Sequence, residues 1–198
     1  MTTSKSLPHH HTLVIIAHPN KKSFSHKIVR SIIDYYESEW LSYDLLDLYD
    51  QPQWFLQLNE INKPLNDDLI DHMQSLIKRA NEIIFCFPLW RFDCPAILKN
   101  RMEVNLTSWF AYRYRPGKLF PKKLLTDKCV RVFVIAWWPT WAYSILWWFI
   151  AFLWYIGRIN YVWMKLRSRT IFPDMNYYKT TESRQWMIEK VKKIIKVS

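Results

Sequence analysis

Three short apolar runs constrain the fold of this chain more than any other feature. They are TLVIIAH (residues 12–18), NEIIFCFPL (81–89) and CVRVFVIA (129–136). None of them alternates strictly between polar and apolar residues, which is typical of strands that are buried on both faces. Parallel strands need long crossover connections, usually helices. The runs therefore predict an α/β sheet that is covered by helices on both faces.

The segments between these runs supply the expected crossovers and two further strands. Residues 24–39 have the pattern of an amphipathic helix, with Ile28, Ile32 and Tyr35 on one face. The other predicted elements are strands at 41–49 and 160–172 and helices at 67–79, 94–106 and 182–197. Five strands in this alternation predict a flavodoxin-like, doubly wound sheet of order 2-1-3-4-5, whose ligand crevice lies at the carboxyl ends of the strands. We expect a flexible leader over 1–11 and one domain over 12–198.

Composition excludes several kinds of binding site. The 198 residues include only Gly117 and Gly157 as glycines, so glycine-rich phosphate loops of the Rossmann or Walker kind are excluded. The net charge of +11 lies in the second half, where 18 Lys and Arg face five Asp and Glu. A basic half attracts anionic lipid, nucleic acid or a phosphorylated cofactor. No RNA-binding motif or zinc-finger spacing accompanies it, so we expect no nucleic-acid partner.

The cysteines and the N-terminus predict a cytoplasmic protein. Cys86, Cys94 and Cys129 form no CxxC pair, and their odd number is typical of reduced thiols. The start, MTTSKSLPHHH, contains no apolar segment of the secretory kind. Its three adjacent histidines bind a metal weakly at best, and a solvated leader is the favoured interpretation. We therefore predict no metal site.

Three motifs at matching intervals resemble one family of enzymes. VIIAHPNKKSFSHKI, NEIIFCFPLWRFDCPAILKNRMEV and WFAYRY are similar to segments of the flavin-dependent NAD(P)H quinone reductases, which include the ancillary oxidoreductases of potassium-efflux systems. The resemblance covers residues 12–114 closely and 130–196 more loosely. It implies FMN as cofactor, with FAD as the other possibility, NAD(P)H as co-substrate and a quinone-like acceptor.

The first strand–helix turn is the candidate site for the cofactor phosphate. The resemblance assigns cofactor binding to His18, Ser23, Phe24 and Ser25, and a helix N-terminus offers free N–H groups to a phosphate. Lys21 and Lys22 add positive charge. A purely structural interpretation stays open, in which Ser23 caps the helix and His18 ends a strand.

The loop after the third strand, FPLWRF, is the candidate site for the flavin ring. Pro88, Leu89 and Phe92 match the family pattern, whereas Trp90 and Arg91 stand where the family usually has glutamine and tryptophan. The resemblance implies that backbone N–H groups and an aromatic edge lie along the ring. Arg91 either stabilises a reduced, anionic flavin or is solvated.

The segment after the fourth strand departs most from the family. Ala136, Trp137 and Trp138 are the cofactor-binding candidates there, but the tryptophans replace paired glycines that let the backbone approach the ring. Tyr143 matches a family tyrosine near flavin and substrate and is the predicted catalytic residue. Phe149 stands where the family has the histidine that accompanies this tyrosine, so we assume no proton relay between positions 143 and 149.

An uncharged run of 26 residues between Arg131 and Arg158 holds six of the twelve tryptophans. It predicts a helix of about sixteen residues from Trp141, roughly 24 Å long and short of the ~30 Å membrane core. We expect burial in a homodimer or pocket first, peripheral membrane contact second and a membrane span last. Two functions follow: an FMN oxidoreductase, or a catalytically silent flavodoxin-like subunit that binds a partner or membrane protein.

Overall fold

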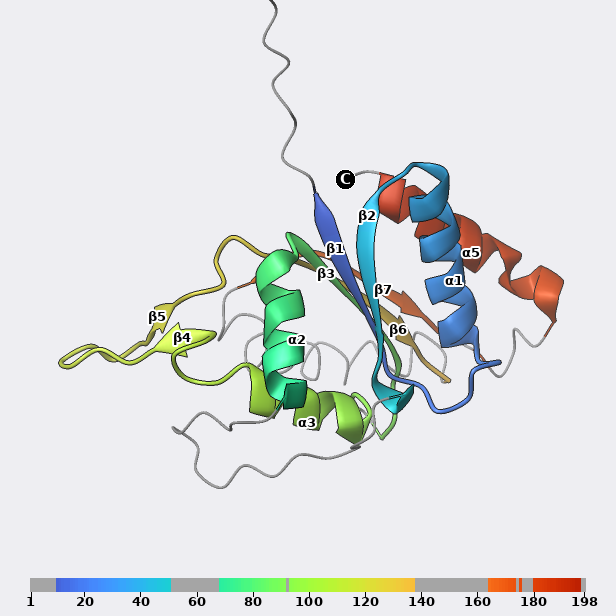
Figure 1. Ribbon diagram of the computed structural model, residues 1–198. Helices are drawn as coiled ribbons and strands as arrows, with labels where there is room; N and C mark the ends of the chain where they lie inside the picture. The colour runs from blue at the N-terminus through green and yellow to red at the C-terminus, as the bar shows by residue number, and fades with distance from the viewer. Residues whose placement is uncertain are drawn as a thin grey trace, which may run out of the picture.

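A computed structural model describes residues 10–50, 68–91, 93–137, 164–173, 175 and 180–196. Its centre is a five-stranded parallel sheet of order β2-β1-β3-β6-β7 (Figure 1). The strands are β1 (His11–Ile16), β2 (Ser42–Asp47), β3 (Glu82–Pro88), β6 (Cys129–Ile135) and β7 (Lys165–Phe172). In chain order of these strands this is 2-1-3-4-5, which confirms the predicted fold class.

Burial along the strands follows their place in the sheet. All seven residues of β3 are buried, as are five of six in β1 and six of seven in β6. These central strands are the three apolar runs of the sequence. The edge strand β7 instead alternates exposed and half-buried residues over its first five positions. The continuous apolar pattern therefore identified the strands with a neighbour on each side.

Helices cover both faces of the sheet (Figure 1). They are α1 (Phe24–Ser38) and α5 (Thr181–Lys196) on one face, and α2 (Asp68–Arg79) and α3 (Ala96–Asn105) on the other. Successive residues of β1 point to opposite faces, so Val14 packs in the core with α1 and α5, and Leu13 packs in the core with α2 and α3. Each such buried side chain stabilises the fold by about 1.5–3 kcal/mol.

The predicted face of α1 is observed with a small difference. Ile28 and Ile32 are completely buried, and Tyr35 is half-buried against the same core. Tyr36, the next residue, is the buried tyrosine of this helix. The helix turns by about 100° per residue, so both tyrosines border the apolar stripe.

Several predicted boundaries and one loop differ from the structure. Residues 48–50 form the 3₁₀ turn η1 (Leu48–Asp50), which ends the second strand earlier than predicted. Between the predicted helix 94–106 and the apolar run 129–136, where no strand was predicted, a short antiparallel pair, β4 (Tyr112–Arg113) and β5 (Lys122–Lys123), projects from the body as an arm (Figure 1). Gly117 lies in the arm at φ +70°, a conformation that suits a glycine. The helix predicted from Trp141 and the first part of the predicted fifth strand lie outside the described residues.

Candidate functional site

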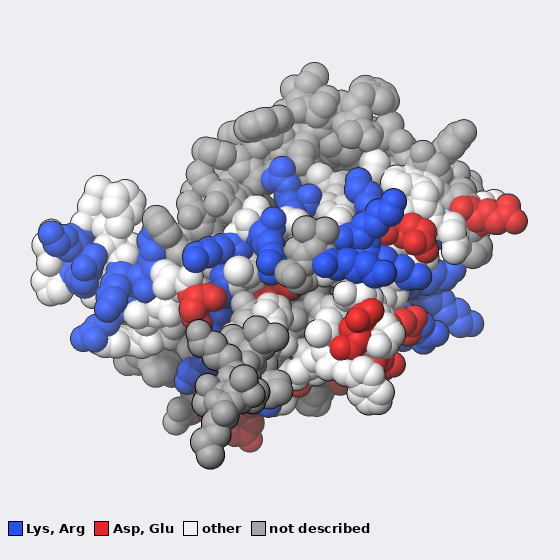
Figure 2. All heavy atoms as spheres, turned by 90° about the horizontal axis from the view of Figure 1, so that it is seen from above, with Lys and Arg blue, Asp and Glu red and all other residues white. Residues whose placement is uncertain are grey.

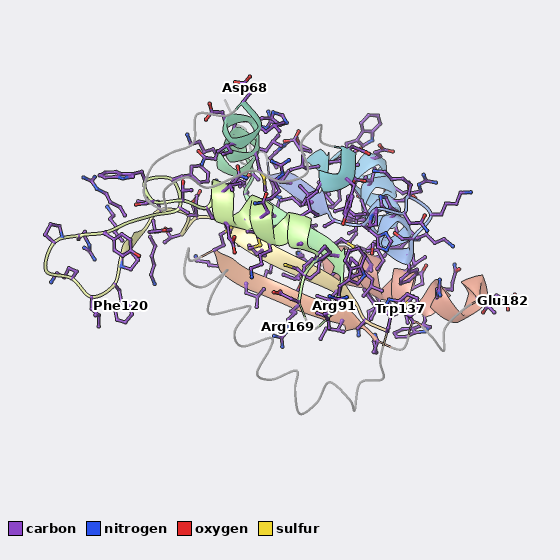
Figure 3. All side chains as sticks on the ribbon, turned by 90° about the horizontal axis from the view of Figure 1, so that it is seen from below. Asp68, Arg91, Phe120, Trp137, Arg169 and Glu182 are labelled. Atoms are coloured by element: carbon purple, nitrogen blue, oxygen red, sulfur yellow. The ribbon has the colours of Figure 1, made fainter. Side chains whose placement is uncertain are left out.

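The sheet has one topological switch point, between β1 and β3. From β1 the chain moves to β2 on one side and then to β3 on the other. The two connections diverge at the carboxyl ends of these strands, which is where ligands bind in open α/β sheets. Figure 3, seen from below, shows Arg91 and Trp137 at this edge, on the loops that follow β3 and β6.

The N-terminus of α1 is capped by Ser23. Ser23 has extended dihedrals (φ −66°, ψ 162°), and its Oγ accepts a hydrogen bond from the His26 N–H at 3.4 Å. This geometry confirms the capping role that the structural interpretation gave to Ser23. The N–H groups of Phe24 and Ser25 lie in the first turn and have no acceptor within the helix, so they are offered to a ligand or to solvent.

His18 is placed beside this helix end as a neutral donor. Its Nδ1 accepts a hydrogen bond from the Asn20 N–H at 3.0 Å, so the neutral ring carries its proton on Nε2. Burial lowers the pKa of His18, and the nearby His26 lowers it further. The imidazole therefore stays neutral at pH 7 and keeps one N–H for a ligand.

The side chains of Phe24 and Ser25 lie in the core. The ring of Phe24 packs edge-on against Phe172 at 6.3 Å between centroids, and the Arg184 guanidinium lies 5.4 Å from its centroid. Ser25 is only 1% exposed, and its carbonyl accepts a hydrogen bond from the Cys86 thiol at 3.6 Å. What these two residues offer at the helix end is therefore backbone.

Lys21 faces carboxylates at this end of the sheet. Its Nζ lies 2.5 Å from Asp47 Oδ2 and 2.6 Å from Asp50 Oδ1. Burial lowers the pKa of Lys21, but its hydrogen bonds to Asp47 and Asp50 outweigh burial and raise it. The charge of Lys21 is thus already engaged, whereas Lys22 is exposed.

The loop after β3 is a tight turn. Leu89 N–H extends the sheet by donating to Ile135 O at 2.8 Å, and Trp90 and Asp93 exchange backbone hydrogen bonds of 2.9 and 3.0 Å. Arg91 has φ +49°, unusual for a residue with a side chain. Such strain costs about 1–3 kcal/mol and tends to occur at ligand sites.

Trp90 connects this turn to the first one. Its ring contacts that of His18 edge-on, with 5.9 Å between centroids, directly across the switch point. Pro88 is the last residue of β3 and is buried. Arg91 is exposed, and Phe92 lies outside the described residues.

The loop after β6 begins at Trp137. Ala136 is completely buried and still bonded within the sheet region, because its N–H donates to Phe172 O at 2.9 Å and its carbonyl accepts from Met175 N–H. Trp137 is 52% exposed, so its indole is not packed into the core. Trp138 and Tyr143 lie outside the described residues, and the catalytic role of Tyr143 stays a prediction.

Two residues of this site were not among the sequence candidates. His26 Nε2 lies 2.9 Å from Asp47 Oδ2, and His26 Nδ1 lies 3.0 Å from Ser23 Oγ. His26 stands three residues after the N-cap, the spacing at which a side chain returns to the cap in a capping box. Asp47 lies near the end of a predicted strand next to β1. The spacing of His26 from the cap and the place of Asp47 near a strand end were the sequence features that could have identified these two residues.

Comparisons with known proteins agree with this fold. An uncharacterised NAD(P)H oxidoreductase of Haemophilus influenzae is 28% identical over 127 residues, which cover 62% of each chain. The FMN-dependent NADH:quinone oxidoreductase 1 of Bacillus licheniformis is 30% identical over 99 residues, which cover 43% of this chain and 47% of that protein. The chain thus spans less than two thirds of the length of both curated relatives.

A solved structure extends the likeness over nearly the whole chain. The NAD(P)H:quinone oxidoreductase from Methanothermobacter marburgensis superposes with a TM-score of 0.76 at 22% identity, covering 94% of this chain and 95% of that one. At this identity the match concerns the fold.

Two further observations complete the comparison. No helix in the described part of the chain has the length and hydrophobicity that crossing a membrane requires. The family model described as flavodoxin-like fold matches residues 10–160, well over half of the chain. This chain therefore belongs to the family with the flavodoxin-like fold.

Proposed function

We propose that this chain is an FMN-dependent NAD(P)H oxidoreductase that reduces a quinone-like acceptor. One observation carries the proposal: at the switch point a capped helix N-terminus and a neutral histidine stand together, next to an aromatic edge. Free N–H groups at a helix N-terminus suit a phosphate, and a planar aromatic edge suits a flavin ring. The relatives from Bacillus licheniformis and Haemophilus influenzae are both named as NADH or NAD(P)H oxidoreductases, which supports the same reaction class.

The phosphate end of FMN fits the residues present. The backbone N–H groups of Phe24 and Ser25 would bind phosphate oxygens, with the Ser23 hydroxyl beside them. His18 would donate through Nε2 to a phosphate or ribityl oxygen. FAD, which has a diphosphate, is the alternative cofactor for the same turn.

The ring end would be held by Trp90 and Arg91. Because the N–H groups of Leu89 and Trp90 are already engaged in the fold, the loop offers the Trp90 indole and the Arg91 guanidinium rather than those two backbone donors. A guanidinium beside the ring would stabilise negative charge that develops there. When bound, FMN supplies the hydride and electron transfer between NAD(P)H and the acceptor.

The exposed Trp137 favours a second candidate function. It stands where the resemblance expects a glycine, and it lies two residues after the carboxyl end of β6. In a catalytically silent subunit, such an indole would contact a protein or membrane partner. Trp138 and Phe149 are further departures from the pattern on the same stretch of sequence.

Absorbance spectroscopy separates the two functions. We expect purified protein to carry a flavin or to take one up from FMN, and to oxidise NADH or NADPH when a quinone is added. Protein that stays colourless after incubation with FMN and FAD contradicts the first proposal. Flavin binding without turnover in the wild type, together with turnover in Trp137→Gly, favours the silent subunit.

We also propose that the protein forms a homodimer, with weaker attraction of its basic residues to anionic membranes. The support is the sequence of residues 141–157, which as a helix would be apolar nearly all round and would give one monomer more apolar surface than it normally leaves exposed. Sedimentation velocity in dilute, detergent-free buffer tests the dimer. A monomer under these conditions would show that the aromatic segment serves another purpose.

A further inference from the structure

We propose that Asp47 and His26 form a proton-coupled anchor for the phosphate of FMN, acting through the hydroxyl of Ser23. The inference rests on the proposed function, because it concerns the same cofactor. It assigns His26 and Asp47 as positioning residues. They would not touch the reacting atoms but would set the hydrogen-bonding state of the helix cap.

A chain of contacts leads from the end of β2 to the start of α1. Asp47 Oδ2 lies 2.9 Å from His26 Nε2, and His26 Nδ1 lies 3.0 Å from Ser23 Oγ. The side chains of His26 and Asp47 are 17% and 10% exposed, so these contacts are mostly shielded from water. Such a geometry transmits the protonation state of the ring to the hydroxyl.

The direction of the Ser23 hydrogen bond depends on that protonation state. The Asp47 carboxylate accepts, so His26 Nε2 carries a hydrogen. In the neutral ring Nδ1 is then an acceptor and takes the hydroxyl hydrogen of Ser23. In the protonated ring Nδ1–H donates to Ser23 Oγ, and the hydroxyl hydrogen is released. Only the protonated ring lets Ser23 donate to a phosphate without losing its contact with His26.

The charge of the surrounding groups favours the same coupling. Lys21 contacts both Asp47 and Asp50, so one ammonium faces two carboxylates. With neutral His26 these side chains carry a net charge of −1, which repels a phosphate. With protonated His26 their net charge is zero. Binding of an anion at the helix end therefore favours uptake of a proton.

The proton is assigned to His26 and not to His18. The two rings lie 6.2 Å apart, and burial followed by the charge of His26 lowers the pKa of His18. The groups that face His26 are Asp47 from β2, Asp50 from η1 through Lys21, and His18 from the end of β1. His26 also lines a groove of about 890 Å³ between α1 and β2, which gives solvent protons access to the ring. The other charged side chains of this groove are Lys22, Lys27, Arg30, Asp34 and Glu37.

FMN and riboflavin, which lacks the phosphate, are the probes for this coupling. Their affinities are measured by flavin fluorescence from pH 8 to pH 6 for the wild type and His26→Gln. We expect the FMN affinity of the wild type, relative to the variant, to rise about threefold to tenfold as the pH falls. For riboflavin, we expect the ratio between the affinities of the wild type and the variant to stay constant over this pH range. Ionisation of the phosphate itself affects both proteins equally.

Two further variants complete the design. Asp47→Asn keeps an acceptor for Nε2–H but removes the carboxylate charge, so the rise in FMN affinity between pH 8 and pH 6 becomes smaller. His11→Gln is the matched control, because His11 contacts Ser42 and Asp44 in the same way at the opposite edge of the sheet. We expect its FMN profile to match the wild type. Circular dichroism checks that each variant is folded. If His26→Gln is unfolded, the FMN profile of Asp47→Asn tests the coupling instead.

Calorimetry in two buffers of different ionisation enthalpy gives a second readout. Wild-type protein is expected to take up a fraction of a proton when FMN binds at pH 7, and His26→Gln to take up less. If the FMN affinities of the wild type and His26→Gln change with pH in parallel, this inference is wrong. Flavin binding and the proposed function would then still stand. Absence of FMN binding to the wild type at every pH overturns both.

Discussion

The two ends of the β1–β2 pair contain the same three types of side chain in nearly the same arrangement. At the amino edge, His11 lies 2.6 Å from Ser42 Oγ and 2.6 Å from Asp44 Oδ2. At the carboxyl edge, His26 lies 3.0 Å from Ser23 Oγ and 2.9 Å from Asp47 Oδ2. Both aspartates belong to β2, three residues apart. We call these groups the amino-edge and the carboxyl-edge clusters.

The two clusters differ in their neighbours. Arg79, from the last turn of α2, contacts Asp44, so the amino-edge cluster is balanced without a proton on His11. The carboxyl-edge cluster has two carboxylates for one lysine and stands at the N-terminus of α1. The serine is a helix cap only in the second case. The comparison teaches that a Ser-His-Asp group acquires a binding role from the helix end beside it.

The largest expected effect separates the two serines. Ser23→Ala removes a helix cap, which costs about 1 kcal/mol of stability, and a donor to the phosphate. We expect FMN to bind about tenfold more weakly, whereas Ser42→Ala leaves FMN affinity unchanged. Flavin fluorescence titration and urea unfolding measure the two consequences. Equal loss of FMN affinity in both variants would remove the distinction between the clusters.

A smaller effect concerns the stability of the amino-edge cluster in acid. Burial raises the pKa of Asp44, but hydrogen bonds from His11 and Arg79 outweigh it and lower the pKa below its ordinary value. A lowered carboxyl pKa contributes stability above the unfolded value of about 3.9, and this contribution is lost as the pH falls through the folded value.

We therefore expect Arg79→Leu to reduce the free energy of unfolding by about 0.5–1 kcal/mol at pH 7. The difference from the wild type should shrink as the solution is acidified to about pH 3. Urea unfolding at several pH values measures it, and FMN affinity at pH 7 serves as the control that should not change. A difference that stays the same down to that acidity contradicts the assignment to Asp44.

The smallest expected effect concerns Lys21 in the carboxyl-edge cluster. The Lys21 side chain is 48% exposed, so Lys21→Met changes stability by less than about 0.5 kcal/mol. The variant leaves Asp47 and Asp50 without their lysine, and we expect FMN to bind about twofold to threefold more weakly at low salt. Titrations at two salt concentrations measure this. Unchanged affinity at low salt would show that the cluster charge does not reach the phosphate.

The sheet was predictable from the sequence because burial on both faces leaves a continuous apolar pattern. β1, β3 and β6 each stand out in this way, and the alternation of strands with helices predicts a parallel sheet, for which the order 2-1-3-4-5 is one of the common arrangements. The turn after β1 was predictable as a helix N-terminus because Ser23 is a good cap. The pattern could not show that Lys21 faces two carboxylates, since Asp47 and Asp50 arrive from a different strand.

Backbone conformation and partner choice account for the other differences at the site. The residue types at positions 90 and 91 do not indicate a left-handed backbone conformation. Arg91 adopts it because the backbone hydrogen bonds between Trp90 and Asp93 close the turn around it. Phe24 and Ser25 are adjacent to the cap, but their side chains belong to the core. The contact of His26 with Asp47 joins residues 21 positions apart, a pairing that depends on the register of β1 against β2.

The parallel arrangement of the sheet also aligns the dipoles of three helices. α1, α2 and α5 each begin at the carboxyl edge and end at the amino edge, so their negative dipole ends gather at the amino edge. Figure 2, seen from above, shows Lys and Arg spread over that face. Exposed cations at the end of α2, the start of β7 and the end of α5 are Arg79, Lys165, Lys193 and Lys196. These cations cover the negative pole, and the opposite edge presents helix N-termini. An anionic ligand approaching the amino edge therefore meets positive charge, which favours fast, salt-dependent association.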